Sequence, residues 1–213
     1  MLEAMSGKYV HLRRGIITAY ESFSVRKDGE WKAACGKNTV GPEYPANFMI
    51  ETALDETWRV SALEAKLKTR SREISSSYRW CAGGWGGGVS ETGRNARDCH
   101  IPMVEGLEVC CPLAFFDGLL FRRLGLLAAS QIRIELLEVQ EESLETVQTY
   151  RIIERLEDEP AQWRGQNVSA SRYRITDPFG EMEGVWVHPR GACLWRRTAG
   201  GEERYRLMEF SEA

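Results

Sequence analysis

The sequence predicts a mainly β protein, a single domain of antiparallel strands over residues 1–213 with one or two short helices. Short segments rich in Val, Ile, Thr and aromatic residues recur along the chain, and turn residues separate them. A length of 213 residues fits one large β domain. We therefore expect strands to cover most of the chain between Tyr9 and Phe210.

The N-terminal part is expected to form long strands joined by tight turns. The pair Asp28-Gly29 is typical of a hairpin turn. Residues 63–68 have helical propensity, but the alternation of polar and apolar residues around them favours a strand. The expected strands run over residues 11–25, 31–35, 48–54, 57–67 and 72–81.

A glycine-rich run at residues 83–88 is the low-complexity segment of the chain. A phosphate-binding loop would need a strand before the run, a helix after it and a Lys-Ser or Lys-Thr pair. The run instead leads into polar residues 90–95. We therefore expect a flexible hairpin tip, with Trp80 and Trp85 exposed beside it.

The middle of the chain contains the expected helix. Pro112 suits a first helical turn, and apolar residues recur at helical spacing over residues 116–124. Residues 131–139 alternate between polar and apolar, which predicts a strand that residues 144–150 continue. Residues 155–166 are polar enough to form a loop.

The C-terminal third predicts a β-meander. Four short β-rich segments are separated by turns that contain proline and glycine. Trp186 and Trp195 are expected to face each other across one of these hairpins, whose turn is at residues 189–191. The four segments are residues 171–175, 182–188, 192–197 and 205–210.

Charge and hydropathy argue against two classes of protein, nucleic-acid-binding proteins and transmembrane proteins. The net charge is −3, and acidic and basic residues are mixed along the chain, so no basic face for nucleic acid is expected. The most apolar window, residues 109–129, is interrupted by Asp117, Arg122 and Arg123, which a transmembrane helix would tolerate poorly. The N-terminus lacks the pattern of a secretory signal, so we expect a soluble, cytoplasmic protein.

Six cysteines are expected to be free, mostly buried thiols, since the cytoplasm keeps thiols reduced. Their spacing matches no standard zinc site, which disfavours a metal bound by Cys99, His100, Cys110 and Cys111. We therefore expect no disulfide, no metal and no cofactor.

From Asp98 onward the order of features resembles a bacterial family named for glycolipid binding. That family has an acidic residue at a strand start, an apolar segment that ends in an Ile-Arg-Arg-Leu motif, a Gln-x-Tyr, a Tyr-rich strand and a closing hairpin. The resemblance implies a spiral β-roll, a single curved antiparallel sheet, and an amphipathic lipid or glycolipid as the partner. The matching positions are Asp98, residues 121–126, 148–150 and 172–174, and the strand pair 185–187 and 193–197.

Arg122 and Arg123 form the sharpest candidate site. Guanidinium groups bind carboxylate or phosphate, and the neighbouring Phe121 and Leu124 could accommodate an acyl chain. Alternatively, one arginine pairs with a carboxylate such as Asp117 while the other is solvated. Paired arginines at element ends are common structural devices, which favours this second interpretation.

The sequence thus predicts a non-enzymatic protein that binds an amphipathic small molecule in an apolar cleft. Trp85 and Tyr150 join the four residues above as candidate ligand contacts. One alternative is an enzyme that acts on an acyl or apolar substrate through His100 or a cysteine. Another is a structural homodimer formed through the sheet edges. No spacing of nucleophile, base and orienting residue supports the enzyme, so no catalytic residue is assigned.

Overall fold

The computed structural model describes residues 4–40, 46–104, 106–123 and 131–212. This described part contains one helix, α1 (Ala114–Arg123), and sixteen strands. The first eight strands are β1 (Met5–Arg13), β2 (Ile16–Asp28), β3 (Glu30–Thr39), β4 (Asn47–Leu54), β5 (Val60–Lys68), β6 (Glu73–Cys81), β7 (Gly84–Glu91) and β8 (Arg97–Pro102). The other eight are β9 (Glu108–Cys110), β10 (Gln131–Val139), β11 (Thr146–Arg155), β12 (Glu159–Trp163), β13 (Gln166–Thr176), β14 (Met182–Val187), β15 (Cys193–Thr198) and β16 (Glu203–Glu212).

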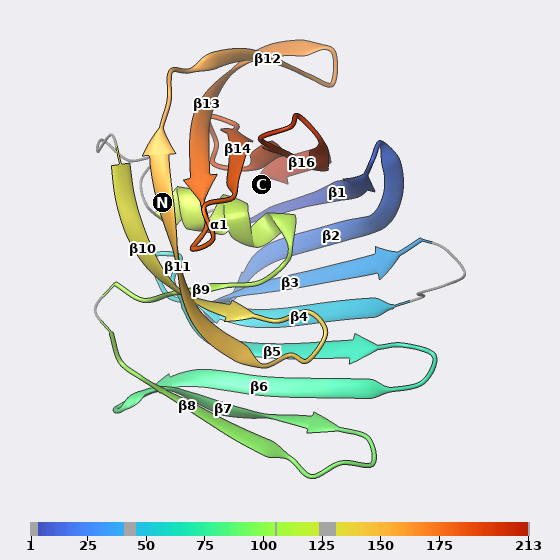
Figure 1. Cartoon of the computed structure of the whole chain (residues 1–213), viewed down its shortest axis with the longest axis vertical. Coiled ribbons are helices and arrows are strands. Elements are labelled where there is room, and N and C mark those ends of the chain that lie inside the picture. The colour runs from blue at the N-terminus through green and yellow to red at the C-terminus, as the bar shows by residue number, and fades with distance from the viewer. Residues whose placement is uncertain (1–3, 41–45, 105, 124–130, 213) are drawn as a thin grey trace.

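The strands form one large, curved sheet, which confirms the predicted fold class (Figure 1). Hydrogen-bonded neighbours follow the order β8 to β1, then β16, β15, β14, β13, β11, β10 and β9, while β12 pairs with β13. The pairing of β1 with β16 joins the first and last strands of the chain. All described pairs are antiparallel except β9 with β10. The sheet is therefore open, with β8 and β9 at its ends.

The β10–β11 hairpin folds back across the N-terminal half of the sheet (Figure 1). At its turn, Leu144 is fully buried with a positive φ of 57°, and its carbonyl oxygen accepts a hydrogen bond from Tyr78 of β6 at 3.0 Å. Glu141 pairs with Lys37 of β3 at 2.7 Å. These contacts fix β10 and β11 as one wall of the space that the curved sheet encloses.

Helix α1 lies inside this space and is buried along most of its length. Phe115 packs against Phe23 of β2, with 4.8 Å between the ring centroids, and Phe121 packs against Tyr173 of β13 at 4.6 Å. A Cβ on Gly118 would lie 3.4 Å from the backbone nitrogen of Cys193, so a glycine here allows the helix to approach β15 closely. The predicted helix is confirmed, although it begins at Ala114, two residues after Pro112.

Two predicted strand boundaries were wrong because tight turns escaped notice. The strand expected over residues 11–25 is the end of β1 and most of β2, and Arg14 and Gly15 turn between them with positive φ angles of 52° and 75°. The strand expected from Thr57 begins at Val60, because Asp55 binds the backbone of Thr57 and Arg59 and closes a turn. The expectation of a strand over residues 63–68 is confirmed.

The polar segment 155–166 is not a loop. It contains β12, which pairs with β13 around a turn at Arg164 and Gly165. The prediction failed because an edge strand with a solvated face has little apolar signal. By contrast, the predicted cross-strand pair of Trp186 and Trp195 is confirmed, with ring centroids 5.9 Å apart.

The glycine-rich run is not a flexible tip either, because most of it is strand β7. An ideal Cβ on Gly87 would lie 2.0 Å from the carbonyl oxygen of Ser77 and 2.8 Å from the Cα of Tyr78. Trp85 is fully buried and packs beside Tyr78 and Trp80, so the expectation that it is exposed was wrong. At Gly87 a glycine is present because the backbone of β6 lies too close for a side chain.

We expect Gly87→Ala to lower the free energy of unfolding by about 1–3 kcal/mol or more, since the new methyl group meets backbone atoms that cannot rotate away. Urea denaturation followed by tryptophan fluorescence measures this loss. Gly86→Ala is the matched control, because its Cβ would have its nearest neighbours at 3.5 and 3.6 Å, an ordinary contact. Equal stability of the two variants would show that close packing does not explain Gly87.

Candidate functional site

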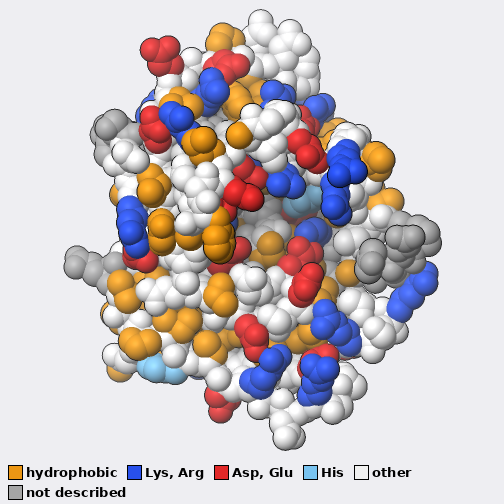
Figure 2. All heavy atoms as spheres, viewed as in Figure 1, with side chains coloured by type: hydrophobic (Ala, Val, Ile, Leu, Met, Phe, Trp, Pro, Cys, Tyr) orange, Lys and Arg blue, Asp and Glu red, His pale blue; other side chains and the backbone are white. Residues whose placement is uncertain are grey.

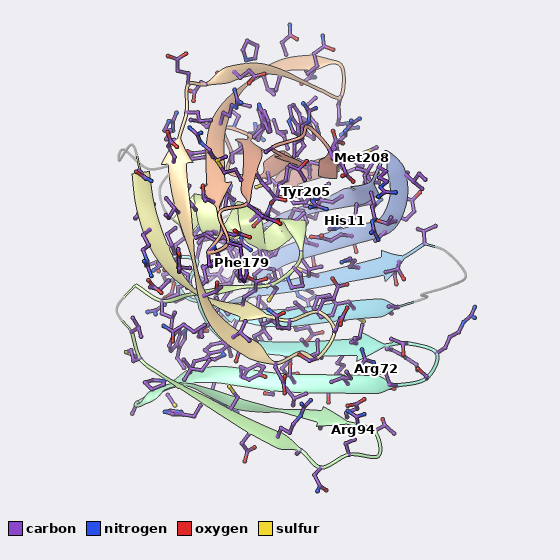
Figure 3. The ribbon with its side chains drawn as sticks, viewed as in Figure 1. His11, Arg72, Arg94, Phe179, Tyr205 and Met208 are labelled. Atoms are coloured by element: carbon purple, nitrogen blue, oxygen red, sulfur yellow. The ribbon has the colours of Figure 1, made fainter. Side chains whose placement is uncertain are left out.

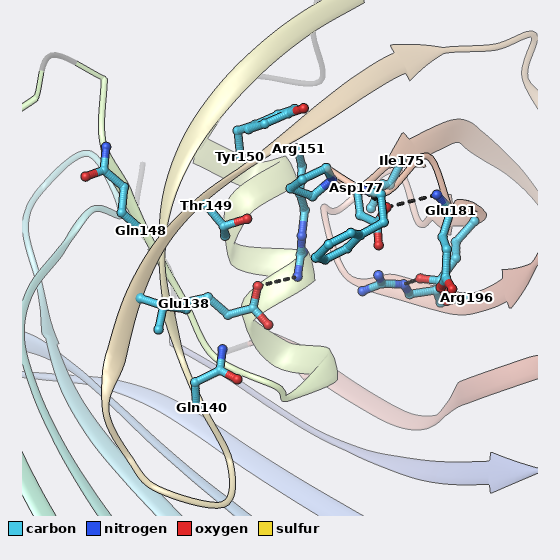
Figure 4. Close-up of a pocket in the computed structure, with 14 residues that line it drawn as sticks. Glu138, Gln140, Gln148, Thr149, Tyr150, Arg151, Ile175, Asp177, Glu181 and Arg196 are labelled. Carbon is cyan, nitrogen blue, oxygen red and sulfur yellow. Dashed lines mark hydrogen bonds and ion pairs between the residues drawn. The ribbon is translucent and has the colours of Figure 1, made fainter.

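A large hollow lies between the β10–β11 hairpin and the turn that joins β13 to β14 (Figure 4). Its volume is about 530 Å³, within the range of small-molecule sites. In Figure 4, Glu138, Thr149 and Arg151 point into the hollow, whereas Gln148 points away from them. The lining residues are Glu138, Gln140, Val147, Gln148, Thr149, Tyr150, Arg151, Ile175, Asp177, Pro178, Phe179, Glu181, Glu183 and Arg196.

A small hollow of about 270 Å³ adjoins it on the side of the first turn of α1. Glu138, Arg151, Glu183 and Arg196 line both hollows, and we call these four residues the floor. Figure 2 shows the recess in the middle of this face, surrounded by acidic and basic side chains. The other residues of the small hollow are His11, Cys111, Pro112, Leu113, Ala114, Asp117, Arg204 and Tyr205.

Beneath the floor, Asp117 of α1 joins three strands. One of its carboxylate oxygens lies 3.1 Å from a terminal nitrogen of Arg151. The other lies 2.8 Å from Arg196 and accepts a hydrogen bond of 2.7 Å from the Tyr205 hydroxyl. Asp117 is only 3% exposed, so these bonds replace water as its partners. This one carboxylate therefore positions both arginines of the floor.

The charges of this network are stable at neutral pH. Burial alone would raise the pKa of Asp117, but Arg196, Arg151 and the Tyr205 hydroxyl outweigh burial and hold it below its usual value. Burial opposes the charge of Arg196 as well, yet Asp117, Tyr205 and Glu183 raise its pKa above the usual value. Asp117 and Arg196 therefore both keep their charges at neutral pH.

The two carboxylates of the floor differ in how well they are paired. Glu183 contacts Arg196 through one oxygen and Arg204 through the other, the latter at 3.3 Å. Glu138 lies 3.8 Å from the nearest nitrogen of Arg151, too far for a direct hydrogen bond. A ligand oxygen that lies beside this pair, off the line that joins the two atoms, can therefore be within hydrogen-bond distance of both Glu138 and Arg151.

Glu21 of β2 lies behind His11 and Ala114, two residues that line the small hollow. Its side chain is fully buried, and its two oxygens accept hydrogen bonds of 2.9 Å from the backbone N–H groups of Ala114 and Phe115. His11 Nε2 lies 2.6 Å from the same carboxylate. In Figure 3, His11 and Tyr205 lie close together, and their ring centroids are 5.9 Å apart. Glu21 thereby satisfies the helix N-terminus that faces this hollow.

Phe179 lies at the mouth of the large hollow and is 91% exposed. Its turn is well ordered by hydrogen bonds, since the Asp177 carboxylate accepts the backbone N–H of Phe179 at 2.8 Å and that of Glu181 at 2.9 Å. Gly180 completes the turn with a positive φ of 82°. The backbone thus holds a large apolar ring in water beside the hollow (Figure 3).

The predicted arginine pair lies elsewhere, since neither residue lines the two hollows. Arg122 contacts Glu212, donates to the Arg190 carbonyl at 2.6 Å and stacks over Trp58. Arg123 binds both oxygens of Glu108, at 2.7 and 2.6 Å. Both arginines have carboxylate partners, Glu212 and Glu108, whereas the structural interpretation expected one of them to be solvated. Their role in ligand binding stays a prediction.

Of the other predicted contacts among the described residues, Tyr150 alone lines the cleft that the two hollows form. The guanidinium of Arg133 lies 3.9 Å from the centre of its ring. Phe121 and Trp85 are buried in the core, and Leu124 lies outside the described residues. The floor could not be recognised in the sequence, because its four residues come from four different strands, β10, β11, β14 and β15. Only strand pairing brings them together.

All six cysteines are free. Burial raises the pKa of the Cys110 thiol to about 11, and it raises that of Cys111 well above its usual value. Thiols with such pKa values are poor nucleophiles at neutral pH. Within the described ranges, no group of three or more His, Cys, Asp or Glu side chains could hold a metal ion.

Two solved structures share the fold. A crystal structure of a DUF1089 family protein from Pseudomonas aeruginosa superposes with a TM-score of 0.59 and 16% identity, over 91% of this chain and 95% of that one. A β-barrel-like protein of DUF1849 from Brucella abortus gives a TM-score of 0.62 and 9% identity, over 100% and 98%. At these identities the similarity shows the β-rich fold alone, and neither protein is described as glycolipid-binding.

No protein-family model matches the sequence, and no curated protein matches it either. In the part of the chain that the structure describes, no helix has the length and apolar character that crossing a membrane requires.

Proposed function

We propose that the protein is a non-enzymatic binding protein for an amphipathic small molecule, held in the cleft between the β10–β11 hairpin and β14–β15. The polar head group of this ligand lies on the floor, and the apolar part of the ligand lies in the large hollow against Val147, Ile175 and Phe179. The separation of 3.8 Å between Glu138 and Arg151 carries this proposal, because it leaves one acceptor and one donor for a ligand. The proposal includes a cytoplasmic location.

The pairing of charges favours a neutral head group with several hydroxyl groups, as in a glycolipid. The floor contains two arginines and two glutamates, and Asp117 also binds both arginines. An acidic group would have to displace one of these carboxylates or lie beside it. A hydroxyl group instead accepts from Arg151 and donates to Glu138 without any net charge.

The exposed ring of Phe179 supports the amphipathic part of the proposal. A single exposed apolar side chain is common on protein surfaces, but this one lies at the mouth of a polar hollow on a hydrogen-bonded turn. A ligand that covered the ring would remove its apolar surface from water, which contributes about 25 cal/mol per Å². Val147 and Ile175 extend the apolar surface into the hollow.

Neither alternative function has an equal basis in the structure. For the enzyme, His100 lines neither hollow, and Cys111 lines the small hollow as a thiol whose pKa is raised. For the homodimer, the exposed edge strand β8 contains Arg97, Asp98 and Pro102. Charged residues and proline are the types that keep an edge strand from pairing with another chain. Both alternatives stay untested.

We expect Glu138→Gln to weaken binding of octyl β-glucoside, a neutral amphiphile, by about 1.5–3 kcal/mol, because one charge-assisted hydrogen bond is lost. Isothermal titration calorimetry below the critical micelle concentration measures this change. Glu154→Gln is the matched control: Glu154 belongs to β11 but pairs with Arg174, outside both hollows. The control should bind like the wild type. If the wild type does not bind the glucoside, or if both variants bind as it does, the proposed site is wrong.

A further inference from the structure

The small hollow has a different character from the floor that it shares with the large one. One side of it consists of the His11 and Tyr205 rings together with Pro112, Leu113 and Ala114. A helix N-terminus normally attracts an anion, but Glu21 already accepts the N–H groups of Ala114 and Phe115. This wall therefore offers an apolar surface and no anion site.

The cleft thus has a charged floor, and beyond it each hollow has some apolar side chains among its polar ones: Val147, Ile175 and Phe179 in the large hollow, and Pro112, Leu113 and Ala114 in the small one. The floor lies in the middle, the large hollow extends from it toward Phe179, and the small hollow extends toward α1. From this geometry we infer that the ligand has a neutral, hydroxylated centre that carries two apolar groups. The longer group occupies the large hollow, and a shorter or planar group occupies the small hollow against His11 and Tyr205. This inference rests on the proposed function and specifies the class of ligand.

Two neutral probes test it. Octyl β-glucoside carries one apolar group, whereas octyl 6-O-benzoyl-β-glucoside carries a second, planar one. The wild type should bind the benzoyl probe at least roughly tenfold more tightly than octyl β-glucoside, because the benzoyl ring is transferred from water into the small hollow. Binding of the glucoside with no gain from the benzoyl group would overturn the inference and leave the proposed function intact. No binding of either probe would overturn both.

Two proline residues provide matched variants, one in each hollow. Pro112 lines the small hollow and Pro178 the large one, and neither position requires a positive φ. Pro112→Trp should fill the small hollow and bring the affinities for the benzoyl probe and for octyl β-glucoside to the same value, whatever its effect on the glucoside itself. Pro178→Trp should change the affinity for both probes by the same factor. A gain that survives in Pro112→Trp would contradict the inference. Thermal melts check the folding of both variants, and if Pro112→Trp does not fold, the two wild-type affinities decide.

Discussion

Asp117→Ala is expected to lower the free energy of unfolding by about 3–5 kcal/mol, the range for breaking a buried ion pair. The alanine would leave Arg151, Arg196 and the Tyr205 hydroxyl without their common acceptor. A buried guanidinium that loses its partner keeps the cost of its desolvation, so the loss exceeds that of a surface pair. Urea denaturation at pH 7 measures the change.

A control and a pH series make this result specific to the network. Asp158→Ala removes an exposed partner of Arg155 and should cost less than about 1 kcal/mol. The pKa of Asp117 is lowered in the folded state, so its contribution is fully present above the unfolded value of about 3.9 and is lost as the pH falls below that value toward the lowered pKa. The wild type should lose stability there, and Asp117→Asn should lose less. Parallel pH profiles for the two proteins would contradict the account.

Glu21→Ala is expected to cost about 3 kcal/mol, because two buried backbone N–H groups and one partly buried imidazole lose their common partner. The Glu21 carboxylate accepts the N–H groups of Ala114 and Phe115 and contacts His11 Nε2. Replacing an exposed cap costs about 1 kcal/mol, and leaving buried donors unpaired adds to that cost. Denaturation measures the total, and amide hydrogen exchange at Ala114 and Phe115 measures the local effect.

Glu51→Ala on the exposed face of β4 is the control for this variant, and its stability should stay close to that of the wild type. In Glu21→Ala the two amides at the start of α1 should exchange faster than in the wild type. The exchange rates of the amides in β16 should change only by the amount that the loss of global stability accounts for. Unchanged protection at Ala114 and Phe115 would show that Glu21 does not hold the helix.

The fold could largely be predicted from local patterns, since β-rich segments, turn residues and one helical period are all properties of neighbouring residues. The predictions were wrong where the same local sequence pattern is compatible with two different structures. The run containing Gly87 looks like a flexible tip, but glycine also suits a strand that packs too closely for side chains. The polar segment that contains β12 looks like a loop, but an edge strand has the same composition.

The candidate site was much less predictable. Arg122 and Arg123 drew attention because they are adjacent in sequence, and in the structure each has its own carboxylate partner. The floor consists of single charged residues on four strands, and Glu138, Arg151 and Arg196 each look like ordinary solvated positions. These residues come together only through the order of the strands in the sheet and through the buried carboxylate of Asp117, and no local sequence pattern encodes either feature.

Native mass spectrometry of the protein purified from its own host tests the binding proposal most directly, because it detects a ligand that no experimenter has chosen. We predict a 1:1 adduct with a neutral amphiphile that solvent extraction releases. We also predict that the adduct is lost or strongly reduced in Glu138→Gln and kept in Glu154→Gln. An unliganded wild type that also fails to bind octyl β-glucoside, or an adduct of equal intensity in both variants, would contradict the account.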